Sequence, residues 1–240
     1  SQLRCVTRQD YRARLLNLPA KFGNIAKCYV ERIGDVTDAT GEQTYNSGLF
    51  VSTLSYNQNR QLVQTPRLIL QNVMYYLNEY RMINDFLDFG FSFSDGGILF
   101  SGYYINFGVQ FVINADRRFD KADIKYQVIN EIIDFFEISK MQFRQSINLN
   151  ELQYNILGIG GVIGVKELKL FQNGVGVSGA RGRQFYYYKA DGTVFSNHNP
   201  AYGFEYNIED ATVDGIVRPS VTPSVFELRN PYADIYGKVI

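Results

Sequence analysis

The sequence is poor in the residues that most often carry catalytic chemistry. Its 240 residues include one histidine, His198, in the loop-like stretch FSNHNPAYG, and two cysteines, Cys5 and Cys28. The histidine has no partner histidine for a metal site, although Ser/His/Asp or Cys/His arrangements can join residues distant in sequence. The cysteines lack Cys-x-x-Cys spacing and lie in or beside apolar segments, which favours buried free thiols over a disulfide.

Net charge and long apolar runs are absent as well. Twenty-four basic residues balance 24 acidic ones, and the lack of a positive excess argues against duplex nucleic acid as the main partner. No run of about eighteen apolar residues occurs, so no segment is expected to span a membrane. The remaining composition, 45% hydrophobic and 20% charged, is that of a globular protein that can bury a substantial core.

Aromatic residues, in contrast, are abundant. Eighteen tyrosines and 18 phenylalanines, with no tryptophan, make up 15% of the chain, and they cluster in the segments 74–81, 101–107 and 184–190. Clustered tyrosine with arginine is typical of protein interfaces. Tyrosine and phenylalanine are also strand formers in β-rich cores, and the sequence leaves both interpretations open for each cluster.

The beginning of the chain predicts a helix followed by strands. Thr7, with Asp10 three residues later, predicts a capping box at the start of a helix over 7–18. Strands are expected over 25–33 and 49–56, separated by a polar loop.

A second helix is predicted in the stretch TPRLILQNVMYYLNEYRMIND. Thr65 is the expected N-cap and Pro66 occupies the first turn, where its missing N–H is harmless. Its expected apolar face consists of Ile69, Val73, Tyr76, Leu77 and Tyr80. The segment 86–100 then alternates aromatic with small residues around Asp-Gly-Gly, which predicts a β-hairpin.

The second half predicts one strand, two helices and another strand. The strand covers 103–113 with period-two alternation, and the first helix covers 120–138. That helix is capped by Asp120 and should bury Ile124, Val128, Ile132 and Phe135. A short helix over 148–156 and a strand over 162–171 follow. This order predicts an α+β fold with helices packed on mixed or antiparallel sheets.

The expected organisation has four parts. They are a first α+β subdomain over 1–100, a strand-helix-helix-strand subdomain over 101–171, an extended arm or loop over 172–204 and a C-terminal β segment over 205–240.

The stretch LGIGGVIGV is the most suggestive motif for a cofactor. Gly158 and Gly160 match the first half of a dinucleotide fingerprint, but Ile163 stands where the third glycine should be. The glycines also follow a helix and lead into a strand, whereas a phosphate-binding loop follows a strand and opens a helix. We therefore predict a tight helix-to-strand turn here and no cofactor.

The other candidate catalytic or phosphate-binding residues are equally weak signals. Carboxylate pairs such as Glu131/Asp134 and Glu209/Asp210 arise by chance among so many acidic residues, and two arginines in the stretch ARGRQ are weak evidence for phosphate binding. We expect no catalytic, cofactor-binding or metal-binding residue and no small-molecule substrate. By elimination, the sequence favours binding over catalysis.

Several stretches taken together resemble one family. CVTRQDYRARLLNLPAKFGNIAKCYV resembles the Thr-Arg-x-Asp-Tyr helix and following strand of the baseplate J-like proteins of contractile tails. LSYNQNRQLVQTP, LNEYRMIND and YYINFGVQFVI are similar to the middle region of the baseplate wedge subunit of T-even-type phages. DGIVRPSVTPSVFELRNPYADIYGKVI resembles its C-terminus. The hairpin at 86–100 and the excursion at 172–200 look longer than the family pattern requires.

The resemblance implies a structural protein of the virion, located in the tail baseplate and assembled in the host cytoplasm. Such subunits pair with a second copy, contact other wedge proteins, link wedges into a ring around the hub and rearrange on sheath contraction. It also implies that this chain corresponds to the C-terminal portion of a longer one. Nucleic acid, membrane and small molecules are not expected partners.

Aromatic clustering beyond one helical stripe suggests where such contacts lie. The candidate interface residues are Tyr75, Tyr76, Tyr80, Arg81, Phe185, Tyr186, Tyr187 and Tyr188. Two alternatives remain: a J-like subunit of a tail-derived injection system, or a carbohydrate-active or receptor-binding tail protein with Tyr- and Asn-rich loops.

Overall fold

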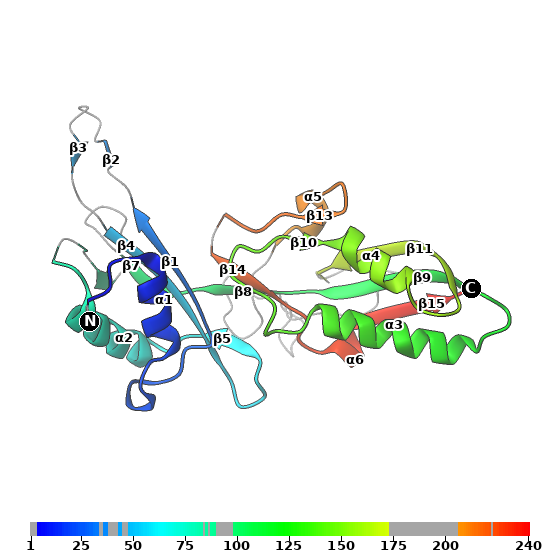
Figure 1. The fold of residues 1–240 in the computed structure, drawn as a ribbon, viewed down its shortest axis with the longest axis horizontal. Coiled ribbons are helices and arrows are strands. Elements are labelled where there is room, and N and C mark those ends of the chain that lie inside the picture. The colour runs from blue at the N-terminus through cyan, green and yellow to red at the C-terminus, as the bar shows by residue number, and fades with distance from the viewer. Residues whose placement is uncertain are drawn as a thin grey trace, which may run out of the picture. The chain divides into compact units, whose positions relative to one another are not determined.

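The chain folds into two compact units, Ser1–Tyr103 and Tyr104–Ile240 (Figure 1). The computed structural model describes residues 4–33, 36–37, 43–44, 48–83, 85, 87–89, 98–172, 206–221 and 223–240. Helices and several mixed or antiparallel sheets alternate along these residues, which confirms the predicted α+β class. The finer division into 101–171, 172–204 and 205–240 stays a prediction.

A five-stranded mixed sheet organises the first unit. Its longest strand, β4, pairs antiparallel with β1 along one edge. The other edge of β4 pairs parallel with β7 and, further along, antiparallel with β5. The strands are β1 (Lys27–Ile33), β4 (Gly48–Tyr56), β5 (Leu62–Gln64), β6 (Asp88–Phe89) and β7 (Ile98–Ser101).

Two helices supply the other half of this unit's core. They are α1 (Arg8–Leu16), followed by the short 3-10 turn η1 (Ala20–Phe22), and α2 (Arg67–Tyr80). One hydrophobic cluster joins them to the sheet; it includes Tyr11, Leu15, Val30, Leu49, Val51, Val73 and Leu77. Leu49 and Val51 alternate along β4 and so share one face of the sheet.

The capping box at the start of α1 is confirmed. The hydroxyl of Thr7 accepts a hydrogen bond from the Asp10 amide at 3.2 Å, and the Asp10 carboxylate accepts from the Thr7 amide at 2.7 Å. These bonds satisfy amides that the helix itself leaves without partners.

The prediction that Thr65 caps α2 is wrong. Pro66 is the N-cap, and no side chain bonds the helix start. Thr65 is buried, and its hydroxyl accepts from the hydroxyls of Thr53 at 3.0 Å and Ser55 at 3.3 Å. Because those two residues lie on β4, Thr65 joins the helix start to the sheet.

The predicted hairpin over 86–100 is also wrong. Strands β6 and β7 pair parallel, with Asp88 opposite Ile98 and Phe89 opposite Leu99, whereas a tight hairpin turn joins only antiparallel strands. Among the described residues of the polar loop after β1, β2 (Val36–Thr37) pairs antiparallel with β3 (Gln43–Thr44).

The second unit is built on a three-stranded sheet of order β11-β9-β15. The central strand β9 (Gly108–Ala115) pairs antiparallel with β11 (Val162–Phe171) and parallel with β15 (Ile235–Val239). Helix α3 (Lys121–Phe135) packs on β15, helix α4 (Leu149–Leu157) packs on β11, and the helices contact each other (Figure 1). Chain segments far apart in sequence therefore meet in one sheet.

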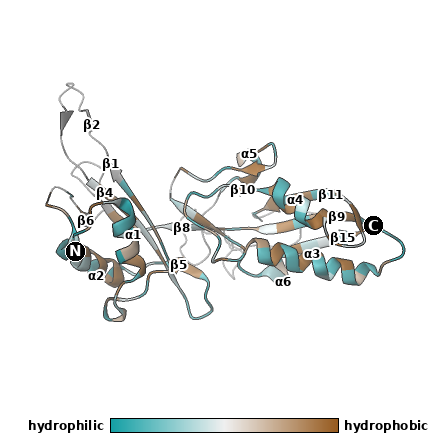
Figure 2. Ribbon diagram, viewed as in Figure 1, coloured by the Kyte–Doolittle hydropathy of each residue, from teal (hydrophilic) through white to brown (hydrophobic). Residues whose placement is uncertain are grey.

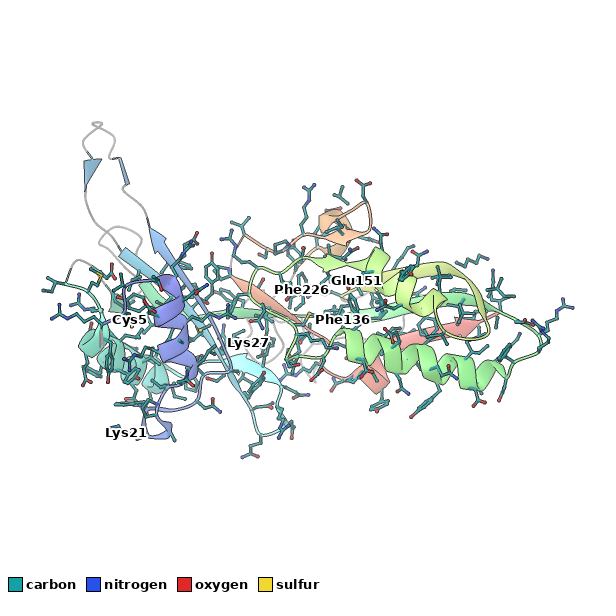
Figure 3. All side chains as sticks on the ribbon, viewed as in Figure 1. Cys5, Lys21, Lys27, Phe136, Glu151 and Phe226 are labelled. Atoms are coloured by element: carbon teal, nitrogen blue, oxygen red, sulfur yellow. The ribbon has the colours of Figure 1, made fainter. Side chains whose placement is uncertain are left out.

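The alternating segment 103–113 forms two strands instead of the predicted one. Strand β8 (Tyr103–Asn106) pairs with β14 (Ser224–Glu227), and β9 begins two residues later in the other sheet. The intervening Phe107 is fully buried against the rings of Phe136 and Phe226, both labelled in Figure 3. The alternation of apolar residues continues across Phe107 because both β8 and β9 have buried side chains. The sequence pattern therefore could not reveal that the two strands pair in different sheets.

The helix predicted over 120–138 begins after its expected cap, Asp120, and buries Ile124, Val128 and Ile132 as expected. Phe136 takes the buried position that the sequence assigned to Phe135. The remaining short elements are β10 (Ile147–Asn148), α5 (Ile208–Ala211), β12 (Thr212–Val213), β13 (Ile216–Val217) and α6 (Pro231–Asp234).

Gly237 of β15 lies directly opposite Phe111 of β9. A Cβ atom at Gly237 would overlap the Phe111 ring, with the ring atom Cε1 at 2.6 Å. The fully buried Phe111 thus occupies the space that a side chain at position 237 would need.

We expect Gly237→Ala to lower the free energy of unfolding by about 1–3 kcal/mol, because the ring must leave its packed position. Chemical denaturation measures this. Gly164→Ala in β11, where an added Cβ meets no atom within 4 Å, is the matched control and should change stability by less than about 0.5 kcal/mol. Equal losses in both variants would contradict the assignment.

Candidate interaction surface

The described part of the chain contains no group of three or more His, Cys, Asp or Glu residues arranged to hold a metal ion. None of its helices combines the length and apolarity needed to cross a membrane. His198 and the arginines of the stretch ARGRQ lie outside the described residues.

The glycine-rich stretch forms the predicted helix-to-strand turn. Helix α4 ends at Leu157, Gly158 is its C-cap, and β11 begins at Val162. Gly161 has a φ of +93°, and a Cβ there would lie 2.8 Å from Cγ of Phe119. Glycine is therefore required at this position for backbone conformation and for packing.

The two cysteines are free and buried, as the sequence favoured. Burial raises the pKa of the Cys28 thiol to about 12, although the nearby Arg12 guanidinium opposes the shift. Burial likewise raises the pKa of Cys5. Because the thiolate is the reactive form, neither side chain is suited to act as a nucleophile near neutral pH.

The carboxylate pairs show no shared site. Asp134 on α3 and both Glu209 and Asp210 on α5 are exposed, and Glu131 is half-buried. The Asp210 carboxylate accepts a hydrogen bond from the side-chain amide of Asn207, which is the N-cap of α5.

Two of the predicted interface tyrosines pack inside the first unit. Tyr76 is 7% exposed and belongs to the core, with its ring 5.4 Å from that of Phe22 and 5.0 Å from that of the partly buried Tyr80. The guanidinium of Arg14 lies 4.1 Å from the centre of the Tyr80 ring, and a hydrogen bond to the Tyr76 side chain raises the pKa of Arg14. These contacts hold α1 against α2.

Arg81 is the C-cap of α2. Its Nε donates to the Asn78 side chain at 2.7 Å, and another guanidinium nitrogen donates to the Asp85 carbonyl at 2.6 Å. The buried carboxylate of Asp85 accepts from the Tyr11 hydroxyl at 2.7 Å. Burial, reinforced by that carboxylate, raises the pKa of Tyr11. The Tyr11–Asp85 bond thereby links α1 to the chain that follows α2.

Tyr75 is the described interface candidate that is clearly accessible. It is 65% exposed, and Leu68, seven residues earlier on the same helix face, is 68% exposed. We call this pair the α2 outer face; Figure 2 shows hydrophobic and hydrophilic residues side by side along the helices. Sequence reasoning missed Leu68, whose signal is an apolar residue outside the buried stripe. Phe185, Tyr186, Tyr187 and Tyr188 lie outside the described residues, and the interface assignment stays a prediction.

A comparison with known proteins gives a distant structural likeness. No model of a protein family and no curated protein matches the sequence. Among solved structures, a cryo-EM structure of the anti-feeding prophage (AFP) baseplate, 6-fold symmetrised, matches with 15% identity and a TM-score of 0.42. The match covers 71% of this chain and 34% of the other, so this chain spans about a third of the matched chain. A likeness of this size establishes neither family nor function.

Tyr11→Phe should lower the free energy of unfolding by about 1–3 kcal/mol, because the buried Asp85 carboxylate loses its hydroxyl donor. Tyr75→Phe, which removes an exposed hydroxyl, is the matched control and should leave stability within about 0.5 kcal/mol. Urea denaturation of both variants measures the difference. A Tyr11→Phe protein as stable as the control would show that the bond contributes nothing.

Alkaline pH should destabilise the fold partly through Cys28. Its thiol has a pKa of about 12 in the folded chain against an ordinary value of 9.0, so the folded state keeps a proton that the unfolded state releases. The contribution of this thiol to stability is complete below its ordinary pKa. It is lost as the pH rises from that value toward the pKa of the folded chain.

Between about pH 8 and about pH 10.5, wild type should therefore lose roughly 2 kcal/mol more stability than Cys28→Ala. For each protein, the free energy of unfolding at the higher pH is compared with its own value at the lower pH. The destabilisation caused by deleting the side chain then cancels. Parallel pH profiles for the two proteins would contradict the assignment.

Proposed function

We propose that this chain is a structural subunit of a contractile-tail baseplate, of the wedge type, that pairs with a second copy and helps to link neighbouring wedges into a ring. Catalysis is not part of the proposed role. The observation that carries the proposal is the ordered series of sequence stretches that resemble baseplate J-like wedge proteins.

Those stretches coincide with elements that organise both units. The first stretch forms α1, η1 and β1, in agreement with the helix and following strand that the resemblance implies. A later stretch forms β8 and β9, and the last one contains β13, β14, α6 and β15. The resemblance therefore involves the framework of the fold as well as its connecting loops.

The chemistry of the described residues supports a role in binding. The two thiols are buried and held protonated, and the motif closest to a cofactor fingerprint is a turn. Both units also expose large apolar side chains: Leu68 and Tyr75 in the first, Tyr126, Tyr154 and Ile163 in the second. Exposed aromatic residues on more than one element suit a subunit with several protein neighbours.

Substitutions of exposed and buried residues of α2 test this role. Leu68→Ala/Tyr75→Ala should fold normally but enter tail particles several-fold less than wild type, because it removes exposed contact area. Tyr76→Ala should instead lower stability by about 3–5 kcal/mol, since it opens a cavity in the core. Tyr75→Phe keeps the ring and should assemble like wild type.

The measurement is the amount of tagged chain that co-sediments with tail particles, alongside thermal unfolding of each purified variant. Normal incorporation of Leu68→Ala/Tyr75→Ala would refute the α2 outer face as a contact. Failure of wild type to enter any tail particle, together with turnover of a carbohydrate substrate, would replace the proposed function with the enzymatic alternative.

A further inference from the structure

The main sheet of the second unit ends at β15. In the order β11-β9-β15, the neighbour of β15 among the described strands is β9. The amide of Ile240 donates to the carbonyl of Ile113 at 2.9 Å, and the amide of Ala115 donates to the carbonyl of Ile240 at 3.1 Å. Successive residues of a strand turn their backbone groups to opposite sides, so every second residue of β15 faces away from β9. These residues are Ile235, Gly237 and Val239, and their outward N–H and C=O groups are called the β15 edge.

The β15 edge is open among the residues that the structure describes. The backbone groups of Ile235, Gly237 and Val239 take part in no hydrogen bond with another described residue. The three residues are half-buried, whereas Lys238 between them is exposed. A row of unpaired backbone groups along a strand is a template on which another strand can pair.

The opposite edge of the sheet, on β11, is built differently. The pairing of β11 with β9 is interrupted by register shifts at two places, and Lys166 and Lys169 are exposed on β11. Bulges and lysines are common means by which proteins prevent a strand from adding to an edge. Strand β15 pairs with β9 in continuous register and carries one lysine, Lys238. The sheet is therefore better protected at β11 than at β15.

Helix α3 carries an apolar stripe that borders the β15 edge. The helix packs on β15, and Ile124 lies next to Gly161 in the turn between α4 and β11, so this side of α3 faces α4 (Figure 1). At 3.6 residues per turn, Tyr126, Ile129 and Ile133 lie on the opposite side. Tyr126 is 64% exposed, and the two isoleucines are half-buried. Because α3 lies on the last strand of the sheet, these three residues border the open edge and are called the outer stripe of α3.

A strand added at the β15 edge would have two different sides. Side chains on the face of the sheet that α3 covers would meet the outer stripe of α3, which favours apolar residues. Side chains on the other face would lie next to Lys238, since successive side chains of a strand alternate between the faces. Lys238 is exposed and forms no ion pair with another described residue. The fitting segment therefore alternates apolar and polar residues and places a carboxylate beside Lys238.

Helix α3 also determines which kind of partner can reach this edge. Neighbouring strands of a sheet lie about 4.8 Å apart, whereas packed helices need about 8–10 Å between their axes. A second copy that paired its own β15 antiparallel to this one would bring its own α3 onto the same face. The two helices would then be too close, because each packs directly on its β15. A lone extended segment brings no helix and has no such conflict.

We propose that the β15 edge and the outer stripe of α3 form the docking site for one extended segment of another protein, which adds to the sheet beside β15. The backbone of the segment would bond Ile235, Gly237 and Val239, and its alternate side chains would contact the outer stripe of α3 and Lys238. Strand addition of this kind takes its affinity from main-chain hydrogen bonds and its specificity from alternate side chains. The docking does not depend on the baseplate role; if that role holds, the segment belongs to a neighbouring protein of the tail.

Hydrogen exchange measured by NMR on the full chain tests whether the edge is open. In the isolated chain, the outward amides of Gly237 and Val239 should exchange at least about tenfold faster than the inward amides of Tyr236 and Lys238. Slow exchange of the outward amides at every chain concentration would show that the chain covers its own edge. Outward amides that become protected as the concentration rises would show that a second copy occupies it. Either result would overturn the inference.

Selection from a library of random short peptides displayed on yeast cells then tests the partner. Peptides that bind the full chain should alternate apolar and polar residues and contain an acidic residue. When the strongest of them is synthesised and added, the exchange of the Gly237 and Val239 amides should slow at least about tenfold. A library without binders, or binders that leave these amides unprotected, would contradict the docking site.

Substitutions separate the backbone bonds from the side-chain contacts. Val239→Pro removes an outward N–H and leaves the bonds between β15 and β9 in place, since proline is tolerated where the N–H of an edge strand faces outward. Its dissociation constant for the peptide should be at least about tenfold higher than that of Val239→Ala, which keeps the N–H. Tyr126→Ala should weaken binding several-fold. Gln127→Ala, on the exposed polar side of α3, should leave binding unchanged.

Thermal unfolding of each variant establishes that it is folded. If Val239→Pro does not fold, a peptide methylated at its backbone nitrogens replaces it, because such a peptide cannot donate to the β15 carbonyls. The methylated peptide should bind wild type at least about tenfold more weakly than the unmodified peptide. Equal affinities of the two peptides, or of Val239→Pro and Val239→Ala, would refute strand addition.

These outcomes are separate from the proposed function. A chain that binds such peptides through β15 but never enters a tail particle refutes the baseplate role alone. A chain that enters tail particles but takes no peptide at its β15 edge refutes the strand addition alone.

Discussion

The second unit depends on one close approach between neighbouring strands. The ring of Phe111 fills the space beside Gly237, so β15 can pair along β9 while the buried face of the sheet stays filled. Since β15 ends the chain and β9 lies near its middle, this contact ties distant segments into one sheet. Helices α3 and α4 pack on the two outer strands of this sheet, β15 and β11. The exposed hairpin of β12 and β13 is held in turn by the first turn of α4.

In the first unit, aromatic residues serve two separate purposes. Tyr11, Tyr76 and Tyr80 join α1 to α2 through a buried hydrogen bond, ring contacts and the arginine over Tyr80. Tyr75, next to Tyr76 in sequence, is exposed on the other side of the helix. The abundance of tyrosine therefore reflects packing as well as available surface. Only the exposed fraction of each ring shows which purpose it serves, and that fraction depends on the fold.

Local signals predicted local structure well. The capping box of Thr7 and Asp10 depends on residues close in sequence and was confirmed. The helical stripe of α3 was confirmed at Ile124, Val128 and Ile132 but not at Phe135. Choices of distant partner were not predictable: β6 pairs parallel with β7, and Thr65 bonds β4 instead of capping its own helix. The interaction surfaces were predicted least, because clustering in sequence cannot distinguish a buried Tyr76 from an exposed Tyr75.

Each of the two units combines a packed core with exposed apolar and charged side chains, and the proposed role of the chain is to hold neighbouring subunits. Cryo-EM of contractile-tail particles produced with this chain carrying an affinity tag tests that claim most directly. We expect density for the chain within the baseplate, in several copies that surround the hub and contact one another. Particles whose baseplate lacks the chain, or a chain placed singly at a receptor-binding tip, would contradict it.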